Sequence, residues 1–189
     1  MSEQKPGQKK GLAVANPSFE ADRFANVPGQ AATNDGVITG WTFKGNVGLN
    51  PWWVNPGKPA GPQHSFSDNG VIPHGRQVAL MQNLCTLAQQ VPGFEAGKRY
   101  RVTYWENGRA YNRSGTLPRL TVTLGGETIV SPHAIQSVEP QDHHTLPYNF
   151  VESALFTAPS DGAYELVFRT LVDGGVTVLL DNVAIAPVE

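Results

Sequence analysis

The stretch RYRVTYWEN, residues 99 to 107, alternates between two kinds of side chain. Tyr100, Val102 and Tyr104 occupy every second position, while arginine, threonine and Trp105 fill the positions between them. Successive side chains of a β-strand point to opposite faces of the sheet, so a period of two indicates a strand. Because the tyrosine and valine series is the apolar one, we expect it to face a core, and we expect the Trp105 side to be exposed.

The same period of two recurs along the chain, and no segment shows the apolar stripe of a helix. LTVTLGGETIV (120–130) predicts two strands joined by a Gly-Gly turn, and further strands are predicted within 162–172 and 175–188. About nine or ten short strands are expected in all, with the other runs at 40–49, 77–82, 86–94 and 148–157. This pattern predicts an all-β fold, a two-sheet antiparallel β-sandwich whose strands each bury one face.

The composition fits a single globular domain, with 189 residues, 40% hydrophobic and 16% charged. We expect residues 12–189 to form it and residues 1–11 to be a disordered tail or a boundary segment. The net charge of −2 offers no basic field for nucleic acid or lipid, and no apolar run approaches the ~20 residues of a membrane span. We therefore expect no nucleic acid and no membrane as partners. Cys85 is the only cysteine, which excludes an internal disulfide.

Several short motifs occur in an order that is typical of one group of β-sandwich domains. Together they resemble galactose-binding-like jelly-roll domains, the group that includes carbohydrate-binding modules and DUF642-type domains. The similarity extends from about residue 14 to residue 186. The motifs are ANPSFE (15–20), ITGW (38–41), IPHGRQVALMQN (72–83), GKRYRVTYWENGR (97–109), ALFTAPSDGAYELVFRT (154–170) and VLLDNVAI (178–185).

The resemblance implies a jelly roll that binds a carbohydrate without catalysis, as an accessory part of a larger multidomain protein. It implies a location outside the cell or at its surface, although residues 1–10 lack the apolar segment of a signal peptide. It also implies a structural Ca²⁺ held by Glu20, Asp181 and backbone carbonyls, which suits the preference of Ca²⁺ for hard oxygen ligands. The alternative is that Glu20 is a solvated charge at a strand end and Asp181 a turn-forming residue.

The candidate ligand surface follows from the polar and aromatic series that begins at Trp105. Aromatic rings can stack on the C–H face of a pyranose, and arginine or asparagine can fix its hydroxyl groups. Two long segments, 50–76 and 131–147, hold further aromatic and histidine residues. The opposing interpretation is that Trp105 lies buried beneath segment 50–76. In that case Arg109 and Arg113 would form surface ion pairs and would not bind an anionic sugar. The expected ligand-binding residues are Trp52, Trp53, Trp105, Asn107, Arg109, Tyr111, Arg113, His143 and Tyr148.

No catalytic constellation is evident in the sequence. The motifs G-x-S-x-G, H-E-x-x-H, G-x-x-x-x-G-K-[ST] and G-x-G-x-x-G are absent, and the five histidines include no H-x-H pair. Nothing places two carboxylates across a cleft, as a glycosidase requires. The first hypothesis is therefore a non-catalytic carbohydrate-binding module and the second a structural or adhesion module that binds protein. A small jelly-roll lyase or hydrolase ranks third.

Overall fold

The structure is a computed structural model that describes residues 11–23, 30–31, 36–51, 71–109, 115–136 and 146–189. Five of the expected ligand residues, Trp52, Trp53, Tyr111, Arg113 and His143, lie outside these described residues. Residues 1–10, which make up nearly all of the expected tail, lie outside them as well.

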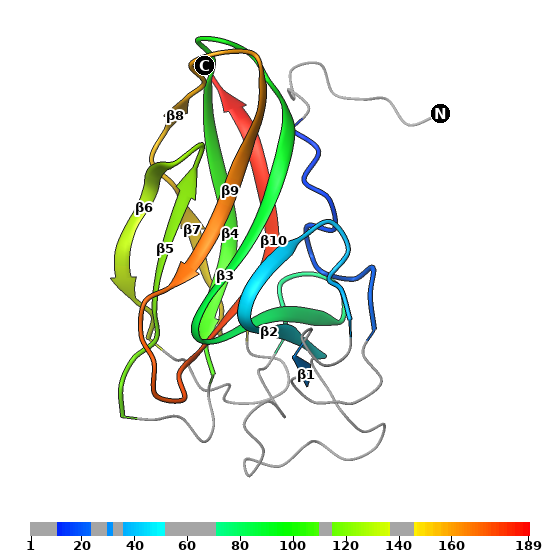
Figure 1. The fold of residues 1–189 in the computed structure, drawn as a ribbon, viewed down its shortest axis with the longest axis vertical. Helices are drawn as coiled ribbons and strands as arrows, with labels where there is room; N and C mark the ends of the chain where they lie inside the picture. Colours follow the sequence, from blue (N-terminus) through cyan, green and yellow to red (C-terminus); the bar gives the residue numbers. More distant parts are fainter. Residues whose placement is uncertain (1–10, 24–29, 32–35, 52–70, 110–114, 137–145) are drawn as a thin grey trace.

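The described part of the chain consists of antiparallel strands and the turns between them, without a helix (Figure 1). No helix long and apolar enough to span a membrane occurs in these segments. Neighbouring strands follow the order β6-β5-β9-β3-β10-β4-β7, with β1 and β2 joined beside β3 and β8 beside β4. The strands are β1 (Gln30–Ala31), β2 (Thr42–Pro51), β3 (Gln77–Phe94), β4 (Arg99–Gly108), β5 (Arg119–Leu124), β6 (Glu127–Ala134), β7 (Asn149–Glu152), β8 (Phe156–Thr157), β9 (Gly162–Thr170) and β10 (Thr177–Val188).

The long strand β3 belongs to two layers because it changes partner midway. Its residues 79–82 pair with β10, and its residues 86–94 pair with β9. At the change Asn83 has a positive φ of 61°, and its Oδ1 accepts a 2.8 Å hydrogen bond from the Gly175 N–H. Two strands were predicted here, at 77–82 and 86–94, and the structure has a single strand of 18 residues instead.

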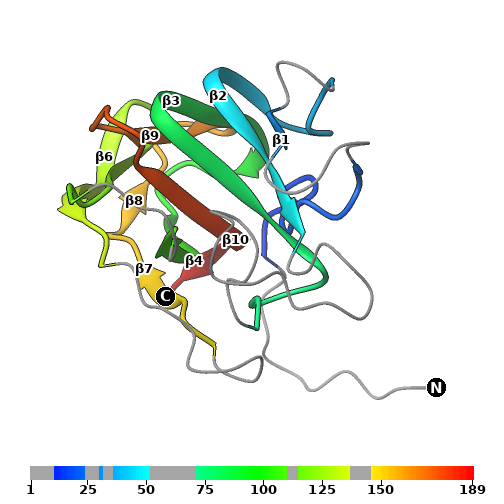
Figure 2. The ribbon, with the colours of Figure 1, turned by 90° about the horizontal axis from the view of Figure 1, so that it is seen from below.

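The two layers are therefore continuous at β3 and curl over each other. Seen end-on, β6, β9 and β3 lie on one side and β10, β4 and β7 on the other (Figure 2). This arrangement confirms the predicted all-β, two-sheet antiparallel sandwich. We call the layers the β9 layer (β6, β5, β9, the second part of β3 and the start of β2) and the β10 layer (the end of β2, the first part of β3, β10, β4 and β7).

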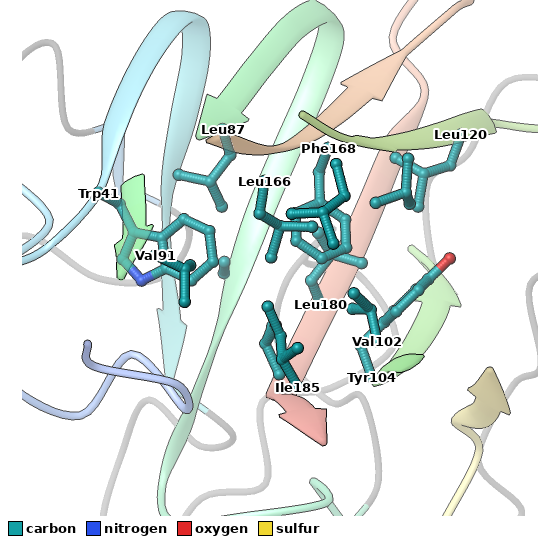
Figure 3. Packing of buried hydrophobic residues seen from close by; sticks show 14 of the residues in the cluster. Trp41, Leu87, Val91, Val102, Tyr104, Leu120, Leu166, Phe168, Leu180 and Ile185 are labelled. Atoms are coloured by element: carbon teal, nitrogen blue, oxygen red, sulfur yellow. The ribbon is translucent and has the colours of Figure 1, made fainter. Parts of the chain in front are cut away.

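The main core fills the space between the layers (Figure 3). Tyr100, Val102 and Tyr104 are buried in it as the alternation of β4 predicted. Phe168 of β9 meets Tyr104 edge to face, with ring centroids 5.1 Å apart and an interplanar angle of 86°. Such aromatic pairs contribute about 0.5–1.5 kcal/mol beyond the burial of their area. In Figure 3 side chains such as Leu120 and Leu180 converge on the same space, so both layers contribute to one core.

A second apolar cluster lies on the outer face of the β10 layer. Since it includes residues of β3 and β10 that alternate with core residues, this layer is covered on both faces. Trp105, which is partly buried, packs against this second cluster. The members of the cluster are Ile72, Val78, Leu80, Tyr148 and Leu179.

Candidate functional site

The Trp105 side of β4 belongs to the outer face of the β10 layer. Directly paired residues of antiparallel strands place their side chains on the same face, so the register shows which residues share it. Strand β10 places Asp181 opposite Trp105 and Leu179 opposite Asn107. Strand β7 places Phe150 opposite Trp105 on the other side. Groups from three strands thus lie side by side in rows across this layer.

Strands β2 and β3 extend these rows with further amide and hydroxyl groups. Gln82 is paired with Asn46 on one side and with Thr177 on the other, and the Asn46 Nδ2 donates a 2.7 Å hydrogen bond to the Gln82 Oε1. Asn50 is paired with Val78 of the second apolar cluster. The outer face of the β10 layer therefore combines an apolar centre with polar rows.

Several polar atoms on this face are buried without a hydrogen-bond partner within the described part of the chain. They are both side-chain atoms of Asn50, the Thr177 hydroxyl, the Tyr148 hydroxyl and the Asn46 Oδ1. Buried polar groups are normally satisfied by protein or water, and an unmade bond costs about 1–3 kcal/mol. The polar groups of these rows that a ligand can reach are the partly buried amides of Asn46 and Gln82.

An aromatic pair forms the accessible edge of this face. The rings of Trp105 and Phe150 have centroids 5.1 Å apart at an interplanar angle of 55°. Phe150 is 51% exposed, so its ring is available to a ligand. Phe150 is not among the expected ligand residues, although its position two residues after Tyr148 in a predicted strand places both rings on one face.

The expected exposure of the Trp105 side is wrong for two of its residues. Asn107 is fully buried and Arg109 is 7% exposed, and the Arg109 Nη2 donates a 2.9 Å hydrogen bond to the Gly175 carbonyl. Burial lowers the pKa of the Arg109 guanidinium. Tyr148 is also buried, and burial followed by the nearby charge of Asp181 raises the pKa of its phenol. The cause of the error is that alternation separates two faces but does not show whether each one is covered.

The two expected calcium ligands both accept hydrogen bonds from the segment 74–77 at the start of β3. The Glu20 Oε1 accepts backbone hydrogen bonds from Arg76 at 2.7 Å and Gln77 at 2.9 Å. Asp181 is fully buried, and its two oxygens accept 2.7 Å hydrogen bonds from the backbone N–H groups of His74 and Asn182. Burial raises the pKa of the Asp181 carboxyl to about 7; the two hydrogen bonds oppose this rise and the charge of Glu20 adds to it.

Gly75 permits this close approach. It has a φ of +74°, and a Cβ at this position would lie 2.4 Å from the Glu20 Oε1. Glycine accepts both the left-handed backbone and the contact, which explains the HGRQ sequence at the start of β3.

The carboxylate pair fits a hard cation in charge and in ligand type. The buried Asp181 carboxylate is poorly compensated by its two backbone N–H donors alone, as the raised pKa of Asp181 indicates. Within the described segments, no group of three or more histidine, cysteine or acidic residues is close enough to hold a metal. A calcium ion here would therefore also need backbone oxygens, which are common ligands for it.

A second ionisable pair joins the two layers at the margin of the main core. The His133 Nε2 of β6 lies 2.8 Å from the Glu106 Oε1 of β4, and the Glu106 side chain is only 5% exposed. The hydrogen bond to Glu106 raises the pKa of His133, while partial burial opposes it. The Tyr104 hydroxyl lies at the margin of the cluster in Figure 3, and burial followed by the Glu106 charge raises its pKa. This pair faces away from the polar rows, on the other side of β4.

No protein-family model matches the chain, and no curated protein sequence is similar to it. Solved structures, in contrast, share its architecture. One is TmCBM61 in complex with beta-1,4-galactotriose, with a TM-score of 0.56 and 15% identity, covering 95% of this chain and 100% of the other. Another is a cyclase from Fischerella sp. TAU, with a TM-score of 0.57 and 15% identity over 95% of this chain and 98% of the other.

A third similar structure is the CBM22-1-CBM22-2 tandem domain of Xyn10C from Paenibacillus barcinonensis, with a TM-score of 0.53 and 13% identity. It covers 99% of this chain, which spans 48% of the tandem. At this level of identity the similarity shows the fold, and it confirms the jelly roll found in carbohydrate-binding modules. It does not separate a binding domain from an enzyme, since the cyclase has the same fold.

Proposed function

We propose that this chain is a non-catalytic carbohydrate-binding module whose ligand lies on the outer face of the β10 layer. The observation that carries the proposal is the pairing of the exposed Phe150 ring with Trp105, on a face that also carries the partly buried amides of Asn46 and Gln82. Aromatic surface next to hydrogen-bonding groups is what a pyranose, with its C–H face and hydroxyl rim, requires.

The two parts of this face have different tasks in the proposed complex. The Trp105 and Phe150 rings stack on the apolar face of a sugar ring at the accessible edge. The amides of Asn46 and Gln82, which lie on the same face and are only partly buried, then exchange hydrogen bonds with sugar hydroxyls. The galactotriose complex of TmCBM61, a jelly roll of similar size, supports a saccharide as the ligand class.

Isothermal titration with β-1,4-galactotriose, combined with a glycan array, tests the proposal. The substitutions Trp105→Ala and Phe150→Ala should each weaken binding by about 1–3 kcal/mol, as for central aromatic anchors. Val37→Ala is a matched control, because Val37 is 70% exposed and belongs to neither apolar cluster. An array without a bound glycan, with and without calcium, would refute the proposal.

We also propose a structural Ca²⁺ at Glu20 and Asp181, because both carboxylates bind the segment 74–77 and the pKa of the buried Asp181 is raised. The ion would stabilise the segment that precedes β3 against the bulge in β10, and no step of ligand binding depends on it. A module of this kind would act outside the cell or at its surface, as part of a larger protein.

A protein-binding role is the second candidate, because exposed apolar side chains flank the second cluster in sequence. Val71 precedes Ile72, and Leu146 and Phe150 lie on either side of Tyr148. If these residues bind a second protein surface or another copy of this chain, Phe150→Asp should abolish association. Light scattering then separates the candidates, since a sugar-binding face predicts a monomer that binds glycans.

A further inference from the structure

The outer face of the β9 layer carries a groove that the proposed sugar site does not use. Two adjoining hollows of about 380 and 290 Å³ lie over β2, β3 and β9, and they share Lys44, Thr86 and Arg169. Thr86 alternates with the core residue Leu87, so this groove opens away from the core. Trp105 points outward from the opposite layer, and the groove and the proposed sugar site therefore lie on opposite sides of the domain.

Two cations and a hydroxyl group form a single row in this groove. Lys44 is paired with Thr86, which is paired in turn with Arg169 on the next strand. Neighbouring strands are about 4.8 Å apart, so the two cationic residues start about 10 Å from each other with the threonine between them. Neither cation belongs to an ion pair within the described residues. Glu165 of the same strand also lines the second hollow, four residues before Arg169.

The backbone holds the lysine end of the row in place through a β-bulge. The register between β2 and β3 shifts between Lys44 and Asn46, and Gly45 has a φ of +81°. A Cβ on Gly45 would lie 2.7 Å from the Leu84 carbonyl oxygen and 2.8 Å from the Cys85 Cβ, so no other residue fits. Bulges of this kind redirect a neighbouring side chain and are frequent beside functional sites.

The groove also has a hydrogen-bonded base and an apolar wall beside the two cations. The Thr170 hydroxyl accepts a 2.8 Å hydrogen bond from the Cys85 N–H, which ties β9 to β3 at the base. Leu84 is 58% exposed and forms an apolar wall together with Leu171. The groove thus offers an apolar surface next to two positive charges.

We propose that this groove binds the carboxylate or sulfate group of an acidic saccharide, as a second glycan site on the side opposite Trp105. This inference rests on the proposed function for its ligand class. The guanidinium fork of Arg169 can hold two oxygens of the anion, the Lys44 ammonium supplies a point charge, and the Thr86 hydroxyl donates between them. Leu84 covers the apolar face of the sugar that carries the anion. Since the chain has a net charge of −2, the attraction is local to this groove.

The substitution pair Lys44→Gln/Arg169→Gln tests the groove by titration with trigalacturonate and with neutral β-1,4-galactotriose. The wild type should bind both ligands, and the double variant should lose at least about tenfold in affinity for trigalacturonate alone. Trp105→Ala should show the opposite pattern, with galactotriose the more affected ligand. Lys98→Gln/Arg99→Gln removes the same charge elsewhere and should have no effect. An equal loss in both double variants would overturn the proposal.

Titration with sodium sulfate, followed by amide chemical shifts, keeps the groove and the proposed function distinguishable. Shifts at Gly45, Thr86 and Thr170 that vanish in the Lys44→Gln/Arg169→Gln variant support an anion site, even if no neutral glycan binds near Phe150. Unchanged shifts at these residues, with trigalacturonate bound equally by wild type and variant, would overturn the groove and leave the Trp105 site standing.

Discussion

Replacing His133 with alanine would leave the buried Glu106 carboxylate without its cationic partner. Removing one member of a fully buried ion pair costs about 3–5 kcal/mol, whereas an exposed pair contributes about 0–1 kcal/mol. The side chains of Glu106 and His133 are 5% and 31% exposed, so this pair lies between the two limits. We expect His133→Ala to lower the free energy of unfolding by about 2 kcal/mol at about pH 5.5.

The effect should depend on pH in a defined direction. The hydrogen bond to Glu106 raises the pKa of His133 in the folded state above its ordinary value of 6.5. The stabilisation is therefore complete below pH 6.5 and is lost as the pH rises through the higher folded-state value. Arg119, whose charge lowers this pKa, reduces the shift without reversing it. At about pH 9 only the neutral hydrogen bond remains, and the cost of the substitution should fall to about 1 kcal/mol.

Urea unfolding of the wild type and of His133→Ala across this pH range measures the effect, and an NMR titration of His133 in Glu106→Gln checks its cause. Lys98→Ala is the control, because its 2.6 Å pair with Glu95 is more than half exposed on both sides. If His133→Ala costs no more than Lys98→Ala, or if its cost is constant with pH, the pair does not join the layers as we infer. A His133 pKa unchanged by Glu106→Gln would show that the carboxylate is not the cause.

Two further predictions concern the segment 74–77, to which Glu20 and Asp181 both bind. Calcium should raise the melting temperature of the wild type more at about pH 8 than at about pH 6, because the Asp181 carboxyl, with a pKa of about 7, releases its proton between these two pH values. The substitution Asp181→Asn should remove this response. A chelator that leaves the melting temperature of the wild type unchanged would argue against the ion. Gly75→Ala should lower the free energy of unfolding by about 1–3 kcal/mol more than Gly97→Ala does. Both glycines have a φ of +74°, but only Gly75 has an atom within 4 Å of the added Cβ. Equal losses of stability in urea unfolding would mean that the Glu20 side chain moves aside freely.

The sequence predicted the fold because its information is local. The alternation of Tyr100, Val102 and Tyr104 with polar residues can be read without knowing any partner strand, and the core confirms it. The order of short motifs extended this to a jelly roll, which the solved structures share. The division of 77–94 into two strands failed only because a strand can bend at Asn83 and continue in a second layer.

The candidate sites depended on contacts between residues far apart in the chain. Phe150 lies beside Trp105, and Lys44 and Arg169 lie on either side of Thr86, because particular strands pair in a particular register. Whether the second face of β4 is open or covered, as at the buried Asn107, depends on what packs over it, and strand periodicity contains no signal for that. A period of two follows from the geometry of a single strand, so the sequence by itself determined a layered β-protein with an inner face. Neighbours across the sheet and over its outer surface arise from folding as a whole, so only the tertiary structure decided which side chains meet.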